Sequence, residues 1–118
     1  MLLENSKIRR QDLAWNDPTA IAAFLADELV CRIAIHDEPF PYVVAQSYRY
    51  RDRDGAFLLH CSRFGKMATL VKANPNVCIE VARLVALLKA PKGQNTSFEY
   101  YSVVARCRAE TIEDVEAV

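Results

Sequence analysis

The sequence lacks an excess of charge of either sign. It holds 15 Lys and Arg residues against 15 Asp and Glu residues in 118, so its formal net charge is zero. A neutral chain has no global positive field to hold a nucleic-acid backbone, so no DNA or RNA partner is expected. A net charge near zero also leaves little long-range repulsion against self-association.

Long apolar runs are also absent. No stretch approaches the roughly 20 apolar residues that a membrane-spanning helix needs. The first fifteen residues carry scattered charges and no apolar segment, so a secretory signal is not expected there. The sequence therefore predicts a cytoplasmic protein without a membrane span. Its length fits one domain, residues 1–118, and is too short for a TIM barrel.

Closely spaced cysteine pairs are missing. The four cysteines are Cys31, Cys61, Cys78 and Cys107, and no two of them form a C-x-x-C motif. Zinc sites use closely paired ligands, so no metal site is expected. In reducing cytosol these residues are expected to be buried or half-buried free thiols. For Cys61, which lies close to a helix start and to Lys66, an oxidation-sensitive thiol is the lesser alternative.

Apolar patterns that are present divide the chain into helices and strand-like segments. Asp17 can cap a helix whose first position suits Pro18. The turn at Asp54-Gly55 is a strong hairpin signal, and the short connections require antiparallel pairing. The expected helices cover about 18–28 and 67–74, and the expected strands cover 30–36, 42–50, 56–60, 77–88 and 97–110. A capping pattern at Thr111 predicts a last helix over 111–118.

These segments predict a mainly β fold of five or six antiparallel strands with small helices outside. Closure into a barrel would remove the exposed edges of so many short strands. A chain of this size buries only a modest fraction of its surface, so a dimer would bury more.

The polar turn before the second helix has features of an anion site. Gly65 and Lys66 stand at the expected helix N-terminus, where free N–H groups and the positive end of the helix dipole favour a phosphate. On spacing alone, a turn glycine followed by a solvated lysine is the commoner interpretation. The P-loop pattern is absent, so a nucleoside triphosphate is not implied.

Three blocks of the sequence together resemble one family. PYVVAQSYRY (41–50), FLLHCSRFGKMATLVKANPNVCIEV (57–81) and YYSVVARCRAETIEDVE (100–116) occur in the order and at the separations of the pyridoxamine 5'-phosphate oxidase-like, FMN-binding split-barrel family. Within this family the sequence resembles the branch related to 5-nitroimidazole resistance proteins. This resemblance implies a six-stranded split β-barrel and a homodimer with FMN at the subunit interface.

The resemblance also implies where the cofactor lies. Ala45, Gln46, Ser47 and Tyr48 match the strand whose backbone lines the isoalloxazine ring. His60 and Cys61 match the strand end beside the flavin, and a histidine at the place of His60 is the usual active-site candidate. Gly65 precedes Lys66 and Met67, which match the pair that holds the phosphate.

Some positions depart from the family pattern. Met67 replaces the second basic residue of the phosphate pair, and Arg63 is the residue that could compensate. Ala45 stands where the branch usually has proline, and Ser47 where it usually has asparagine. Cys107 replaces a usual glycine. Family members usually continue past residue 118, which leaves open whether the last helix is complete.

Two functions follow from the resemblance. The first is an FMN-dependent oxidoreductase of nitroreductase-like type that passes electrons to a small-molecule acceptor, with His60 near the ring. The alternative is a non-catalytic flavin- or haem-binding dimer associated with stress, which the departures at Met67 and Ala45 favour. Oxidation of pyridoxamine phosphate itself is disfavoured, because the true oxidases carry a C-terminal substrate segment that this chain lacks.

Overall fold

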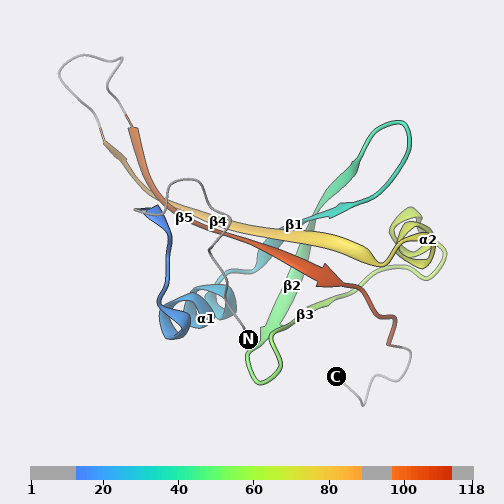
Figure 1. Ribbon diagram of the computed structural model, residues 1–118, viewed down its shortest axis with the longest axis horizontal. Helices are drawn as coiled ribbons and strands as arrows, with labels where there is room; N and C mark the ends of the chain where they lie inside the picture. Colours follow the sequence, from blue (N-terminus) through green and yellow to red (C-terminus); the bar gives the residue numbers. More distant parts are fainter. Residues whose placement is uncertain (1–12, 89–96, 113–118) are drawn as a thin grey trace.

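The computed structural model describes residues 13–88 and 97–112, which form antiparallel β structure with two helices (Figure 1). The elements are α1 (Pro18–Asp27), β1 (Val30–Ile35), β2 (Tyr42–Arg51), β3 (Ala56–Leu59), α2 (Lys66–Ala73), β4 (Asn76–Leu88) and β5 (Ser97–Arg108). Each bound lies within two residues of its sequence-based prediction. Thr111 and Ile112 are not helical, and the rest of the predicted last helix lies outside the described residues. No helix among the described residues is both long and apolar enough to cross a bilayer.

The strands form one curled sheet in the order β3-β2-β1-β4-β5, with every neighbouring pair antiparallel. The mainly β, split-barrel architecture predicted from the sequence is confirmed, but the described residues form five strands rather than six. The five strands correspond to the five segments that the sequence pattern marked, and the longest of them are β4 of 13 residues and β5 of 12. Together they make a long hairpin that extends past the rest of the sheet (Figure 1).

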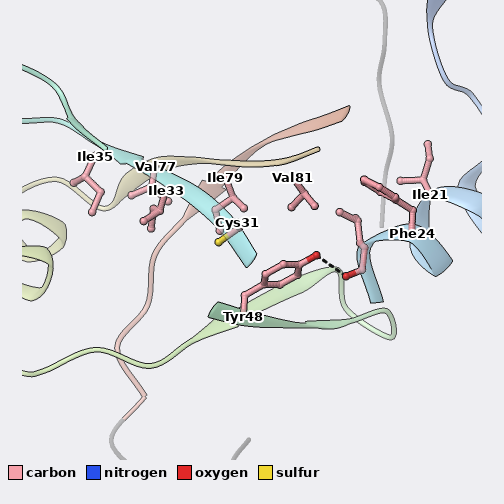
Figure 2. Close-up of a cluster of buried hydrophobic side chains, with 10 residues drawn as sticks. Ile21, Phe24, Cys31, Ile33, Ile35, Tyr48, Val77, Ile79 and Val81 are labelled. Atoms are coloured by element: carbon pink, nitrogen blue, oxygen red, sulfur yellow. Dashed lines mark hydrogen bonds between the residues drawn. The ribbon is translucent and has the colours of Figure 1, made fainter. Parts of the chain in front are cut away.

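The hydrophobic core lies on the inner face of the sheet, between the sheet and α1 (Figure 2). Ile33 of β1 pairs with Ile79 of β4, so alternate residues of both strands point to this face. Its fully or nearly buried members are Ile21, Phe24, Leu25, Cys31, Ile33, Ile35, Tyr48, Val77, Ile79 and Val81. The core therefore fixes β1, β4 and part of β2 against one helix.

Both ends of α1 are held by side chains. The Oδ1 atom of Asp17 accepts a hydrogen bond of 3.1 Å from the backbone N–H of Ala20, which confirms the predicted cap. At the other end, the guanidinium of Arg83 on β4 donates to Asp27 at 2.9 Å and to Glu28. The same guanidinium lies 5.1 Å from the ring centroid of Phe24. These contacts fix the helix over β4.

Tyr48 links α1 to β2 from inside the core. Its side chain is 5% exposed, and its hydroxyl donates a hydrogen bond of 2.6 Å to the backbone carbonyl of Leu25 (Figure 2). Burial disfavours the phenolate and raises the pKa of Tyr48 to about 12. The strand that carries the predicted flavin-binding backbone is thus anchored to the first helix.

This buried phenol predicts a loss of stability in alkali. Unfolded tyrosine ionises near pH 10, so the stability tied to the neutral phenol is complete below about pH 10 and is lost as pH rises toward 12. Two pKa units correspond to roughly 2–3 kcal/mol. Tyr48→Phe is expected to remove most of this pH dependence, and to cost ~1 kcal/mol at neutral pH through the lost hydrogen bond.

Urea unfolding of wild type and Tyr48→Phe at about pH 8 and about pH 11 measures the effect. Tyr100→Phe is the matched control, because Tyr100 is 61% exposed and should behave as wild type. Parallel losses of stability in wild type and Tyr48→Phe would show that the phenol is not the titrating group.

Candidate flavin-binding site

The two edges of β2 are covered to different extents. β1 pairs with Tyr42–Ser47 along one edge, whereas β3 pairs only with Tyr48–Arg51 along the other. The backbone N–H of Tyr48 donates to the carbonyl of Leu29 at 3.1 Å, on the β1 side. Successive residues of a strand direct their N–H and C=O groups to opposite edges, so those of Ala45 and Ser47 face the edge on the β3 side. No strand of the described residues pairs with that stretch.

The chain leaving β3 runs beside this open stretch of β2. The side-chain amide of Gln46 donates a hydrogen bond of 2.6 Å to the backbone carbonyl of His60. The side chains of His60 and Cys61 are both exposed. The structure therefore brings the segment Ala45–Tyr48 together with the pair His60 and Cys61, which are distant in sequence.

The solvent exposure of Cys61 differs from the prediction. A buried or half-buried thiol was expected, but the residue is exposed. The cause is local, since β3 ends at Leu59 and residue 61 has already left the sheet. The other three cysteines are buried or half-buried as predicted.

The turn into α2 leaves an open helix N-terminus. Gly65 is the N-cap with φ of −81°, and no side chain caps the first turn. The backbone of this turn is closed by a hydrogen bond of 3.1 Å from the Gly65 N–H to the carbonyl of Ser62. Because residue 65 has no side chain, the first N–H groups of α2 remain accessible to a ligand.

Lys66 is the first residue of this helix and is held toward the start of β2. Its Nζ atom lies 3.2 Å from Oδ2 of Asp37 and 5.4 Å from the ring centroid of Tyr42. The hydrogen bond from Lys66 and a second one from the backbone N–H of Glu38 lower the pKa of Asp37. The lysine side chain is 62% exposed, so solvent screens this ion pair and an arriving anion can compete for the lysine.

The side chains of Met67 and Tyr48, two of the residues predicted to bind the cofactor, pack in or against the core. Met67 is half-buried and packs against the core, so its side chain belongs to the hydrophobic contact between α2 and the sheet. The side chain of Tyr48 is in the core, which leaves its backbone as the part that could face a ligand. Arg63, the residue that could compensate for Met67, is exposed in the turn.

The residues form a strip with two chemically different ends. Ala45 and Ser47 offer backbone donors and acceptors at one end, and Lys66 offers a cation at the other. Three to five residues separate Tyr42, which lies next to Lys66, from these positions, or roughly 10–17 Å of strand. In residues 13–88 and 97–112, no group of three His, Cys, Asp or Glu side chains is placed to hold a metal ion.

Comparison with family models matches residues 17–118 to the pyridoxamine 5'-phosphate oxidase family. A search of curated proteins finds no significant match. A solved flavocytochrome from Azotobacter vinelandii has the same fold, with 23% sequence identity and a TM-score of 0.78 over 92% of this chain and 50% of its own.

Two other solved structures are similar at slightly higher identity. One is a FAD-binding protein from Mesorhizobium loti, with 26% identity and a TM-score of 0.65 over 86% of this chain and 64% of its own. The other is a proposed 5-nitroimidazole antibiotic resistance protein from Bacteroides thetaiotaomicron, with 27% identity and a TM-score of 0.73 over 87% of this chain and 60% of its own. The chain thus spans between a half and two thirds of each of these proteins. With the family model matching most of its length, the chain belongs to the pyridoxamine 5'-phosphate oxidase-like family.

Proposed function

We propose that this chain is an FMN-binding flavoprotein and acts as an FMN-dependent oxidoreductase on a small acceptor. The observation that carries the proposal is the open edge of β2 at Ala45 and Ser47, which lies beside His60 and leads toward Lys66. FMN has a flat ring with polar atoms on its rim and a phosphate at the end of its side chain. It therefore matches a site with backbone donors and acceptors at one end and a cation at the other.

Each end of the strip suits one part of FMN. The backbone N–H and C=O groups of Ala45 and Ser47 would hydrogen-bond to the polar atoms of the ring. Lys66 and the first N–H groups of α2 would hold the phosphate, which is favoured by the charge and by the helix dipole. When bound, FMN would supply the transfer of electrons between a donor and the acceptor.

His60 is proposed to work beside the ring. Its backbone is fixed by the hydrogen bond from Gln46, while its imidazole is exposed. A histidine in that position can orient a small acceptor and pass a proton to it as it is reduced. Cys61, which is exposed next to it, would form the wall of the same site.

We also propose a homodimer with the flavin between subunits. The outer face of the sheet exposes large apolar side chains from β1, β2, β4 and β5, namely Val30, Val43, Leu84, Tyr100 and Val104. An apolar sheet face of this kind is typical of a surface that another chain covers. A second subunit would also exclude water from a flavin lying on the edge of β2.

The test is a visible absorption spectrum of the purified protein before and after FMN is added, with gel filtration alongside. A flavin spectrum shifted from that of free FMN and co-eluting at the mass of a dimer is expected. A folded protein that stays colourless with excess FMN contradicts the proposal. Bound flavin that is not reduced by NADH or NADPH above the rate of free flavin favours the non-catalytic flavin-binding alternative, and the same spectra with added haem test its haem-binding form.

A further inference from the structure

A second concave surface lies where β1 ends, β4 begins and β5 ends. This groove has a volume of about 670 Å³, and His36, Asn76, Arg106 and Arg108 are the polar residues of its lining. Ala34 and Pro41 are among the apolar ones. We name it the arginine groove. Its volume lies within the range of small-molecule sites, roughly 300–1,000 Å³.

The sheet register places the two arginines side by side. Arg106 lies opposite Cys78 of β4, which in turn lies opposite Ala34 of β1. Arg108 lies opposite Asn76, two residues further along β5. Residues two apart in a strand share one face, with about 7 Å between their Cα atoms. Both arginine side chains therefore project from the same face of the sheet, at the groove.

Neither arginine forms an ion pair with any residue of 13–88 or 97–112. By contrast, Arg32, Arg51 and Arg83 are each paired with an acidic side chain. As far as the described residues go, the groove therefore holds two unpaired cations that a bound anion could neutralise.

His36 adds a further polar group on the β1 side of the groove. It directly follows β1 and is exposed, with Nε2 3.4 Å from Oε1 of Glu38. Glu38 is itself largely exposed, so solvent weakens this contact. The carboxylate of the next residue, Asp37, is instead paired with Lys66. The groove and the proposed phosphate end of the flavin site thus have separate sets of cations.

We infer that the arginine groove is a second ligand site, which binds an organic phosphate or pyrophosphate other than the flavin. A guanidinium presents its N–H groups in a planar fork that matches two phosphate oxygens, and two such groups can hold adjacent phosphates. The apolar residues of the lining would contact the body of the ligand. The inference uses none of the residues of the proposed FMN site, but the groove opens on the same face of the sheet as Val43 and Val104, so in the proposed dimer the second subunit would border it.

The test is calorimetric titration of the full chain with inorganic pyrophosphate at fixed, low ionic strength. Saturable binding is expected, weakened about fivefold to twentyfold by Arg106→Gln and by Arg108→Gln. Arg108→Lys is expected to fall between Arg108→Gln and wild type, because it keeps the charge but loses the fork. Arg53→Gln, at an exposed arginine in the β2–β3 turn, is the matched control and should bind as wild type does.

Lys66→Gln separates this groove from the proposed flavin site. Pyrophosphate binding that persists in Lys66→Gln and falls in the two arginine variants supports the inference, whether or not the wild-type protein binds FMN. Binding that is lost in Lys66→Gln and kept in the arginine variants overturns it, since the anion then occupies the flavin phosphate site. Absence of saturable binding, or an equal loss in Arg53→Gln, also overturns it.

Discussion

Lys66→Gln is expected to weaken FMN binding by about tenfold to a hundredfold. The substitution removes the cation at the first position of α2, while a glutamine can still form a neutral hydrogen bond. A charge-assisted hydrogen bond to a phosphate contributes ~1.5–3 kcal/mol, which corresponds to that change in affinity. Quenching of flavin fluorescence on titration gives the dissociation constants.

The fold should not change in this variant, because the Lys66 side chain is 62% exposed. Lys72→Gln is the matched control, since Lys72 is an exposed lysine in the last turn of the same helix. It should leave the affinity for FMN as it is. If both variants lose affinity equally, general charge attraction and not a contact at the helix N-terminus holds the phosphate.

Asp37→Asn is expected to act in the opposite direction. In the structure the Asp37 carboxylate is paired with the ammonium group of Lys66. Its negative charge would repel the phosphate of FMN. Its lowered pKa keeps this carboxylate ionised across the neutral range. Neutral asparagine should therefore tighten FMN binding, by at most about fivefold for a pair that solvent screens. Weaker binding in Asp37→Asn would instead mean that the carboxylate holds Lys66 in its binding position.

The sequence predicted most of the fold because local signals agreed with the tertiary arrangement. The Asp17 cap with Pro18 and the turn at Asp54-Gly55 each depend on a few neighbouring residues, and all are present in the structure. The sequence of β1 alternates, and in the structure Cys31, Ile33 and Ile35 are buried whereas the residues between them are not. The sixth strand that the family resemblance implied had no segment of its own among the five that the sequence pattern marked.

The site was predicted less completely, and the missing parts depend on long-range contacts. The ion pair between Asp37 and Lys66 joins residues that are 29 positions apart, and no sequence motif predicts it. His36 stands beside no motif in the sequence, yet β4 and β5 bring Arg106 and Arg108 to the same groove. The exposure of Cys61 followed from where β3 ends, and strand ends are the least certain feature of a sequence pattern.

Leu25→Ala is expected to lower the free energy of unfolding by about 2–5 kcal/mol. The Leu25 side chain is 0% exposed at the centre of the contact between α1 and the sheet, so its removal leaves a cavity in the core. A typical domain is stable by only ~5–15 kcal/mol, so this single change takes a large part of the total. Urea unfolding followed by the fluorescence of Trp15, which packs on Phe24 of the same helix, gives the loss.

Leu29→Ala is the matched control, because Leu29 is the same residue type four positions later and is 71% exposed. It should change stability by less than ~0.5 kcal/mol. The backbone carbonyl of Leu25 that holds Tyr48 is retained in the alanine variant, so the open edge of β2 should keep its geometry in the folded fraction. Excess FMN should therefore restore part of the lost stability through binding to the native state alone. A large loss of stability without recovery by FMN would show that α1 shapes the flavin site directly rather than bracing the strand that carries it.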